Sequence, residues 1–371
     1  MTTPGTAYAV VTGGGTSGHV LAALAVADAL VARGHDHDSI HYVGATRGVE
    51  RRLLPPTGYD FSLLDVTGLQ RSLAIRNLAF FPKLIGSTWR ARRLIRKLSP
   101  KVVVNVGGYA SFPATAAAML NRVPYVVVSY DRRPGLVSRL MARRAAACAV
   151  AFDGSALPRS EITGAPVRQE VLNVDRARDR SAARSQLDLP HDRFVLAVFG
   201  GSLGARRLNE VVSQLVERLA HRRDLAIYHV VGERNLPDAA PARDGSHGIM
   251  YRVRGYEDRM PLVYAAADLM MTRAGAATIA ELATVGMPSI IVPWPGAAEN
   301  HQVDNARELS GHHGAVLIEE RDLTADRLIA ELAELMTNPA ELTAMSLAAS
   351  GIGERHRSAA LVDLIERVAS R

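Results

Sequence analysis

Short continuous runs of apolar residues alternate along the chain with longer segments that have helical periodicity. In the first part of the chain the apolar runs occupy residues 7–11, 40–43, 101–106 and 125–128, with helical segments at 21–31 and 87–98. Unbroken apolar runs of this length are typical of parallel strands that are buried on both faces. After a charged, loop-rich stretch at 164–190, further runs follow at 194–199, 226–231, 269–272 and 289–292. The pattern predicts two doubly wound α/β domains.

Both halves begin with the same local order of strand, glycine-rich turn and helix. VVTGGGTSGHVLAALAVADAL starts at Val10, and LAVFGGSLGARRLNEVVSQLV starts at Leu196. The first N–H groups of a helix have no intrahelical acceptor, so a glycine-rich turn before the helix presents them to phosphate or another anion. A tight strand-to-helix crossover explains the glycines of one loop equally well. The repetition favours two ligand sites.

The first loop, GGGTSG, satisfies the G-x-G-x-x-G fingerprint of nicotinamide-binding domains. That fingerprint also requires an acidic residue at the end of the second strand, where it holds the ribose hydroxyls. Here the strand IHYVG ends at Gly44, and Asp36 and Asp38 precede it. A dinucleotide site is therefore not expected. His19 directly follows the last glycine, and an imidazole that titrates near neutral pH suits acid–base chemistry at such a position.

Composition limits the partners and the setting. The 371 residues carry a formal net charge of +7, which favours an anionic partner such as a phosphorylated ligand, a membrane surface or a nucleic acid. Cys148 is the only cysteine, and its surroundings RRAAACAV favour a small buried hydrophobe over a nucleophile. MTTPGTAYAVV lacks the basic region of a signal peptide, and no apolar run is long enough to span a bilayer. We expect a cytosolic protein that touches a membrane without crossing it.

Seven motifs occur in a fixed order along the chain: GGGTSGHV, GATRGVERRLLP, GGYASFP at 107–113, GAPVR at 164–168, GGSLGARRLN at 200–209, RAGAATIAEL at 273–282 and ENHQVDNA at 299–306. In order and spacing they resemble the MurG family, the peptidoglycan glycosyltransferases that add N-acetylglucosamine (GlcNAc) to undecaprenyl-diphospho-muramoyl-pentapeptide. The resemblance implies an α/β fold of the GT-B type, in which two Rossmann-like doubly wound domains face a cleft. Residues 1–163, with a returning C-terminal helix within 352–371, would form the acceptor and membrane domain, and residues 164–351 the donor domain.

The resemblance also assigns the site of the donor, UDP-GlcNAc, mainly to the second domain. The substrate-binding residues there would be Ser202, Gly204, Glu257, Ala276, Ala277, Thr278, Glu281, His301 and Gln302. Ser202 and the N–H groups of the loop 200–204 would hold a phosphate oxygen, with Arg168 as the cationic partner. An interdomain salt bridge is the alternative role for Arg168.

The helix that follows Gly275 offers a further anion site at its N-terminus. Glu281 would accept the ribose hydroxyls, although a carboxylate in the first turn of a helix is also favoured by the helix dipole alone. His301 and Gln302 would contact the donor sugar, for which they supply donors and acceptors. No Asp-x-Asp pair flanks the donor motifs, so we expect no obligatory metal and no cofactor.

The first glycine loop would then serve the acceptor diphosphate and the reacting centre. Thr16, Ser17 and Gly18 would approach the sugars, and Tyr109 and Asp131 complete the predicted substrate-binding set. His19 is the predicted general base for the attacking hydroxyl, in a single displacement that inverts the anomeric centre. Asp131 is the competing candidate for the base.

Three segments depart from the family pattern. In VVVSYDRRPG, Val128 and Ser129 replace the His and Glu of the family's His-Glu-x-Asn signature, and Asp131 replaces the Asn. Ala165 replaces an Asn in GAPVR, and Phe112 replaces a glycine in GGYASFP. These departures leave three alternatives open: a related GT-B enzyme for another sugar, lipid or metabolite, a UDP-GlcNAc 2-epimerase, and a non-catalytic protein that binds nucleotide sugars. An epimerase predicts an acid–base carboxylate set and no basic apolar patch, and this sequence has the reverse.

A basic segment with an apolar strip indicates contact with a membrane. No acidic residue occurs between Asp65 and Asp131, and residues 71–101 supply nine Lys and Arg. The strip comprises Phe80, Phe81, Leu84, Ile85 and Trp89, a composition typical of a helix on an anionic leaflet. A core-facing helix with a solvated basic face is the alternative, and no recognised module supports nucleic acid. A polyprenyl-diphosphate acceptor favours the membrane, so we expect a peripheral protein on the cytoplasmic face of the cell membrane.

Overall fold

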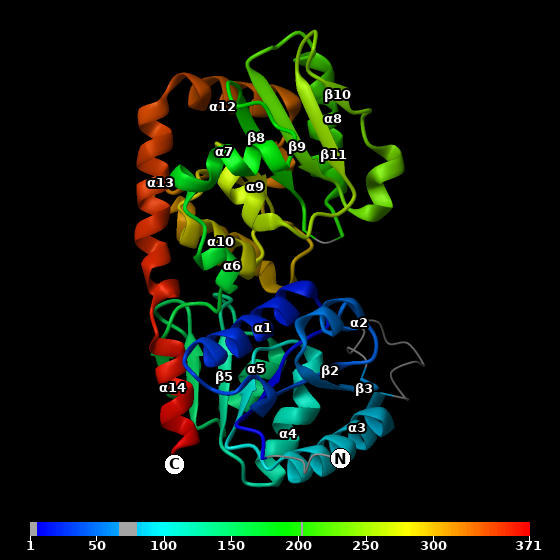
Figure 1. Ribbon diagram of the computed structural model, residues 1–371, viewed down its shortest axis with the longest axis vertical. Coiled ribbons are helices and arrows are strands. Elements are labelled where there is room, and N and C mark those ends of the chain that lie inside the picture. Colours follow the sequence, from blue (N-terminus) through cyan, green and yellow to red (C-terminus); the bar gives the residue numbers. More distant parts are fainter. Residues whose placement is uncertain (1–5, 67–79, 202) are drawn as a thin grey trace. The chain divides into compact units, whose positions relative to one another are not determined.

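The computed structural model describes residues 6–66, 80–201 and 203–371. The chain divides into two compact units, residues 1–169 with 355–371 and residues 170–354. The boundary expected after residue 163 lies after Gln169 instead, so the segment GAPVR belongs to the first unit. Figure 1 shows the red helix α14 (Ala360–Ala369) beside the blue and cyan elements of the first unit.

A parallel sheet forms the centre of the first unit. Within the described residues its strand order is β3-β2-β1-β4-β5-β6-β7. The strands are β1 (Ala9–Thr12), β2 (Ile40–Ala45), β3 (Asp60–Leu64), β4 (Val102–Asn105), β5 (Tyr125–Ser129), β6 (Ala147–Val150) and β7 (Ser160–Ile162). Because all neighbouring pairs are parallel, the loops that follow β1, β4 and β5 lie next to one another at one edge of the sheet.

Helices cover both faces of this sheet. The helices α3 (Phe80–Leu98), α4 (Phe112–Leu120) and α5 (Leu136–Ala142) share one core with the strands, in which Ala91, Ala117 and Met141 are buried. On the other face, α14 contacts β4, β5, β6 and α1 (Ser17–Ala32). Short α2 (Glu50–Leu53) follows β2. Cys148 is buried in the core as a free thiol, which confirms the prediction of a small hydrophobe.

The second unit repeats the doubly wound design. Its strand order among the described residues is β10-β11-β9-β8-β12-β13-β14, and all pairs are parallel except β10 with β11. The strands are β8 (Phe194–Phe199), β9 (Leu225–Val230), β10 (Arg243–Asp244), β11 (Met250–Arg254), β12 (Leu269–Thr272), β13 (Ser289–Ile291) and β14 (Ala315–Leu317). The predicted parallel sheets are therefore confirmed in both units.

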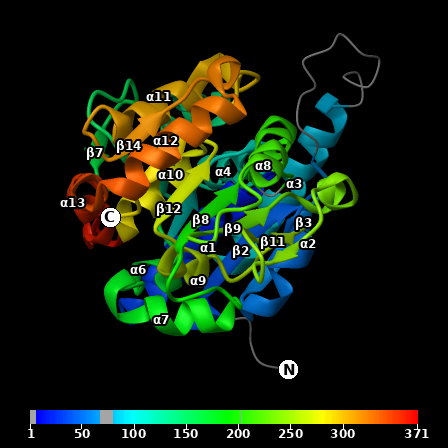
Figure 2. The ribbon, with the colours of Figure 1, turned by 90° about the horizontal axis from the view of Figure 1, so that it is seen from above.

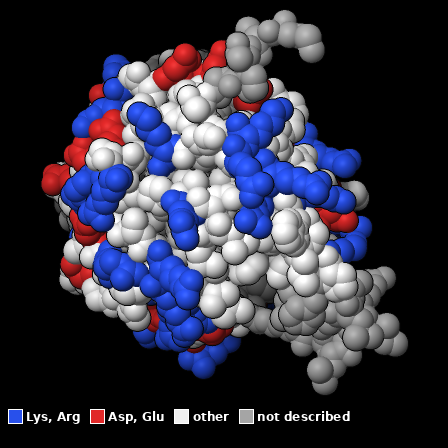
Figure 3. Space-filling view, turned by 90° about the horizontal axis from the view of Figure 1, so that it is seen from below, with Lys and Arg blue, Asp and Glu red and all other residues white. Residues whose placement is uncertain are grey.

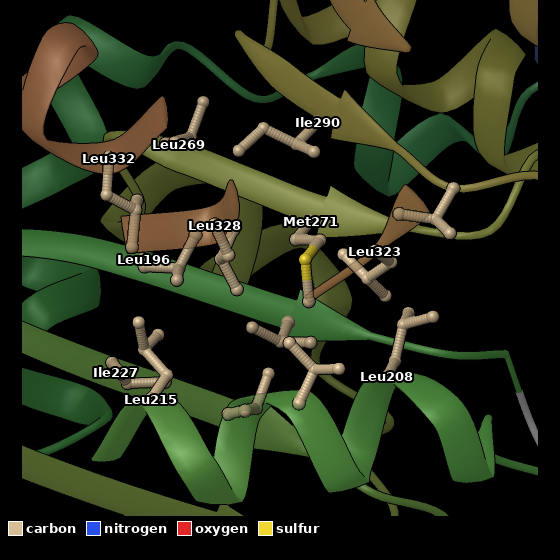
Figure 4. Close-up of a cluster of buried hydrophobic side chains, with 14 of the residues drawn as sticks. Leu196, Leu208, Leu215, Ile227, Leu269, Met271, Ile290, Leu323, Leu328 and Leu332 are labelled. Atoms are coloured by element: carbon tan, nitrogen blue, oxygen red, sulfur yellow. The ribbon is translucent and has the colours of Figure 1, made fainter. Parts of the chain in front are cut away.

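Two helices, α8 (Arg206–Arg218) and α12 (Ala325–Thr337), pack together over one face of the second sheet. Figure 4 shows Leu208 and Leu215 of α8 and Leu328 and Leu332 of α12 pointing at Leu196 and other strand residues. Figure 2 shows α7 (Arg176–Gln186) and α9 (Met260–Ala266) on the opposite side of these strands from α8. The remaining helices are α6 (Gln169–Leu172), α10 (Ala276–Val285), α11 (His301–Ser310) and α13 (Pro339–Gly353).

Candidate active site

Three helices begin directly after glycine-rich or small-residue loops at the carboxyl edges of the two sheets. They are α1 in the first unit and α8 and α10 in the second. Their N-cap residues are Thr16, Ala205 and Gly275, and within the described chain none of these caps forms a side-chain hydrogen bond to its helix. Since the first-turn N–H groups lack intrahelical acceptors, each terminus can bind an anion.

The first glycine loop is held tightly between β1 and the loop that follows β4. Gly15 has φ +93°, and a Cβ there would lie 2.4 Å from the ring of Tyr109. Gly108 has φ +77°, and a Cβ there would lie 1.9 Å from the carbonyl oxygen of Gly14. Only glycine fits at such a position without moving the backbone. The structure thereby brings Tyr109 against the loop that carries Thr16, Ser17 and Gly18.

His19 lies in the first turn of α1, at the carboxyl edge of the sheet. Its Nδ1 is 2.9 Å from Oγ1 of Thr16. Its Nε2 lies beside Gly107, where a Cβ would be 3.3 Å away. Tyr130 completes the surroundings, since its hydroxyl donates to the Gly18 carbonyl at 3.2 Å and its ring centroid is 6.3 Å from that of His19. The imidazole therefore has a fixed orientation within reach of the loops after β1, β4 and β5.

The buried carboxylate of Glu50 is hydrogen-bonded to the first glycine loop, and Glu50 was not among the site residues predicted from the sequence. Glu50 is fully buried at the start of α2. Its Oε1 accepts from the N–H of Gly15 at 3.0 Å and from that of Ala45 at 3.4 Å, and its Oε2 is buried without a recorded hydrogen-bond partner among the described residues. Burial and the nearby Glu50 raise the pKa of Tyr109. One N–H group of the loop is thus already bound to a carboxylate.

The segment that departs from the family pattern follows β5. Val128 and Ser129 are buried at the end of this strand, whereas Asp131 is half-buried in the loop beyond it. Arg132 extends across to the loop after β6, where its guanidinium lies 5.0 Å from the centroid of the Phe152 ring. Asp131 and His19 therefore both belong to the carboxyl edge of the same sheet.

In the second unit, the glycine loop after β8 leads into α8. Gly204 has φ +74°, and a Cβ there would lie 1.9 Å from the Val231 carbonyl oxygen. The Gly204 N–H donates to the Gly201 carbonyl at 2.8 Å, so this N–H group is engaged within the turn itself. Ser202 lies outside the described residues. The N–H groups at the start of α8 remain the predicted phosphate donors of this loop.

Gln302 connects two strand-end loops of the second unit. Its Oε1 accepts from the N–H of Ala274, after β12, at 3.2 Å and from the N–H of Trp294, after β13, at 2.9 Å. The amide nitrogen is left as a donor. Ala276, Ala277 and Thr278 form the first turn of α10, two residues beyond Ala274. The predicted sugar-binding and phosphate-binding residues of this unit thus share one edge of the sheet.

The residues just before His301 have an unusual backbone conformation. Glu299 has φ 51° and Asn300 φ 56°, both in the left-handed region. For residues other than glycine, this conformation costs on the order of 1–3 kcal/mol each and is concentrated at functional sites. His301 is the first residue of α11 and is half-buried. A recess of about 660 Å³ beside this segment is lined by Asn300, Arg207 and Arg307 among others.

Two predicted carboxylates have structural partners. Glu281 lies in the second turn of α10, not in its first turn, and its Oε2 accepts from the Tyr264 hydroxyl at 2.7 Å. The dipolar explanation for Glu281 is therefore wrong. Glu257 is buried, and its Oε1 accepts from the backbone N–H of Arg259 at 2.9 Å and from its Nε at 3.1 Å. Burial opposes ionisation of Glu257, but hydrogen bonds from Tyr228 and Arg259 outweigh it and hold the pKa of Glu257 below its usual value.

Arg168 belongs to the first unit, one residue before its boundary. It is half-buried and lies directly before α6. The sequence interpretation placed it in the donor domain. Its role at the diphosphate stays a prediction.

Helix α3 faces the core with one side and solvent with the other. Ala91 and Ile95 are buried in the first unit's core, whereas Ile85 is 59% and Trp89 57% exposed. The side chains of Phe80 and Phe81 lie outside the described residues, and Leu84 is half-buried. In Figure 3, Lys and Arg side chains gather around uncharged areas, and Asp and Glu are few near the centre of this face. Over the described ranges, no helix is both long and apolar enough to cross a membrane.

The described residues contain no group of three or more His, Cys, Asp or Glu side chains placed to hold a metal ion.

Two doubly wound units with glycine-rich loops at their carboxyl edges define the class: the protein is a glycosyltransferase of the GT-B fold. The family models described as the glycosyltransferase family 28 N-terminal domain and C-terminal domain match residues 9–150 and 195–365. Together with the relatives described next, these matches show that the chain belongs to the MurG family.

Relatives match over almost the whole chain. The UDP-N-acetylglucosamine--N-acetylmuramyl-(pentapeptide) pyrophosphoryl-undecaprenol N-acetylglucosamine transferase of Clavibacter michiganensis is 40% identical over 97% of this chain and 96% of its own length. The enzyme of the same name from Desulforudis audaxviator is 37% identical over 98% of each chain. The crystal structure of Acinetobacter baumannii MurG aligns with a TM-score of 0.71 and 26% identity, over 97% of this chain and 99% of that chain. The glycosyltransferase of kitacinnamycin, at 18% identity and a TM-score of 0.67, shares the fold.

Proposed function

We propose that this protein transfers GlcNAc from UDP-GlcNAc to undecaprenyl-diphospho-muramoyl-pentapeptide, the step that converts lipid I to lipid II in peptidoglycan synthesis. The proposal rests on sequence similarity: this chain is 37–40% identical, over nearly its full length, to enzymes that are named for this activity. The reaction is a single displacement at the anomeric carbon with inversion. UDP leaves as the acceptor hydroxyl attacks.

His19 is the proposed general base. In the tautomer that this role requires, Thr16 Oγ1, 2.9 Å from Nδ1, accepts the Nδ1 proton, and Nε2 is the basic nitrogen. Nε2 then takes the proton of the attacking hydroxyl. Asp131, on the neighbouring loop after β5, is the second candidate. Ser129 offers no carboxylate at the position where the family's acidic residue stands.

The leaving UDP gains negative charge, and the N-termini of α8 and α10 with Arg168 are proposed to stabilise it. Preorganised N–H groups and a guanidinium supply the positive field that a metal ion would otherwise provide. His301 and the amide nitrogen of Gln302 are proposed to bind the hydroxyls of the donor sugar. Their position next to the left-handed pair Glu299 and Asn300 supports a functional role for that segment.

We propose that the protein works as a peripheral protein at the cytoplasmic face of the cell membrane and does not bind nucleic acid. The exposed Ile85 and Trp89, with arginines and lysines on the same helix, support contact with an anionic leaflet. The lipid-linked acceptor is located in that leaflet, so the two parts of the proposal agree.

Incubation with UDP-GlcNAc and a citronellyl-diphospho-muramoyl-pentapeptide tests the proposal directly. Disaccharide formation, followed by liquid chromatography, is expected at the same rate with and without a chelator. Product with UDP-glucose but not with UDP-GlcNAc would assign another sugar. Absence of any product under conditions in which calorimetry detects UDP binding would favour a non-catalytic protein, and loss of product on chelation would contradict the metal-free mechanism.

A further inference from the structure

Helix α5 exposes two leucines beside the candidate active site. Leu136 is 69% exposed and Leu140 is 45% exposed. They are four residues apart, so they lie on the same side of the helix. The opposite side is anchored in the core through Met141 and Ala142. The two leucines therefore offer a small apolar surface on the solvent side of α5.

The core-facing side of α5 lies close to the loops that hold His19. Ser138 is buried on that side, and its Oγ lies 3.7 Å from the position of a Cβ on Gly107, which would also lie 3.2 Å from Cδ2 of the His19 ring. Helices α3, α4 and α5 cover the same face of the sheet. The exposed leucines of α5 and the exposed Ile85 and Trp89 of α3 therefore belong to one helical layer of the first unit.

Two arginines precede helix α5 in the loop after β5. Arg132 and Arg133 follow β5 directly and are exposed at the carboxyl edge of the sheet. The guanidinium of Arg132 is fixed by the Phe152 ring and by its contact of 3.4 Å with the Asp153 carbonyl. Arginine binds the oxygens of a phosphate through paired N–H groups.

The glycine loop alone is a weak site for a diphosphate. The Gly15 N–H is bound to Glu50, and the buried carboxylate places negative charge directly behind the loop. A diphosphate at this edge therefore needs cations from a neighbouring loop. The loop after β5 supplies two.

We propose that Arg132 and Arg133 bind the diphosphate of the lipid-linked acceptor and that Leu136 and Leu140 carry the first isoprene units of its prenyl chain away from the reacting sugar. This inference rests on the proposed function, because it assigns the acceptor's diphosphate and lipid to named residues. The charge pattern fits such a ligand: an anionic group at the arginines is followed by an apolar chain along the leucines. The acceptor thus spans the distance from the reacting loops to the helical layer.

Steady-state kinetics with two acceptors test the assignment. One acceptor carries a citronellyl chain and the other a heptaprenyl chain, in the same detergent. In the double variant Leu136→Ser, Leu140→Ser, the ratio of kcat/KM for the long chain to that for the short chain should fall by about tenfold, since two half-exposed leucines lose their apolar contact. In Arg132→Ala, Arg133→Ala, the acceptor KM should rise by about tenfold to a hundredfold for both chains, while the KM for UDP-GlcNAc stays unchanged.

Matched controls come from the second unit. Leu347→Ser removes a leucine that is 69% exposed on α13, and Arg223→Ala removes an exposed arginine before β9. Both should leave the chain-length ratio of kcat/KM and the acceptor KM unchanged. Calorimetry with UDP first establishes that each variant binds UDP with wild-type affinity. For such a variant, an equal fall of kcat/KM for both chain lengths in the leucine variant would overturn the inference. An unchanged acceptor KM in the arginine variant would also overturn it. Absence of disaccharide with the wild-type protein would instead refute the proposed function.

Discussion

Replacement of Trp89 by serine should weaken binding to anionic membranes strongly. Trp89 is 57% exposed on the outer side of α3, while Ala91 and Ile95 of the same helix hold it to the core. A tryptophan has up to ~250 Å² of surface to bury, so insertion of its exposed part removes ~140 Å² from water. At ~25 cal/mol per Å² this contributes ~3.5 kcal/mol, or roughly three-hundredfold in the partition coefficient.

Tryptophan fluorescence provides the assay, because Trp89 and Trp294 are the two tryptophans of the chain. In a Trp294→Phe background, Trp89 is the single indole, and its emission should shift to the blue on vesicles that contain anionic lipid. Flotation then compares Trp89→Ser with Leu347→Ser, which removes an apolar side chain that is 69% exposed in the second unit. Binding should also weaken as salt rises, because charges are screened beyond about 8–10 Å. Unchanged flotation of folded Trp89→Ser, or no blue shift, would refute the assignment of this helix to the membrane.

Three further predictions concern the site and the stability of the first unit. His19→Ala should lower kcat by roughly 10²–10⁴-fold with UDP affinity near that of the wild type, and Asp131→Asn should retain activity; the opposite pattern in the two variants would assign the base to Asp131. Arg168→Ala should weaken binding of UDP relative to uridine by about 1.5–3 kcal/mol in calorimetry, and equal losses for both ligands would remove Arg168 from the diphosphate. Burial, with Arg355 nearby, lowers the pKa of His356 to about 4 from 6.5, and its Nδ1 accepts from the Ala165 N–H at 3.0 Å. Between these values the unfolded chain takes up a proton that the folded chain does not, so the free energy of unfolding should fall by about 3 kcal/mol as pH drops from 6.5 to 4. Hydrogen exchange of α14 should show this loss of protection, and His356→Gln, which keeps an acceptor but does not titrate, should reduce it; the same pH dependence in both proteins would contradict the argument.

The strands that were predicted from sequence are those buried on both faces. The apolar run 194–199 coincides with β8. This strand lies in the centre of its sheet, between β9 and β12, so its residues are apolar on both faces and form an unbroken run in the sequence. The missed strands are mostly short or near an edge: β7 is three exposed residues, and β3 begins with exposed Asp60 and Phe61. Helix α3 spans Phe80–Leu98 and so extends further toward the N-terminus than the predicted segment 87–98.

The site was predictable where a local motif carries the chemistry and not where partners are distant in sequence. His19 and the glycine loops follow from the order of strand, turn and helix. Glu50 lies in the motif GATRGVERRLLP, but its hydrogen-bond partner Gly15 is 35 residues away in the chain. No local sequence pattern identifies a hydrogen bond over that separation. Similarly, the bridging oxygen of Gln302 joins Ala274 and Trp294 only once β12 and β13 are side by side.

The return of residues 355–371 to the first unit sets an order of events during synthesis. All residues of the second unit, 170–354, are complete before the ribosome has made α14. Until α14 has left the ribosome, the buried residues Leu364, Ile365 and Val368 cannot cover their part of the first unit. The half of the protein that is translated first is therefore the half that is finished last, and its uncovered sheet face is exposed to chaperones and proteases while the second unit folds.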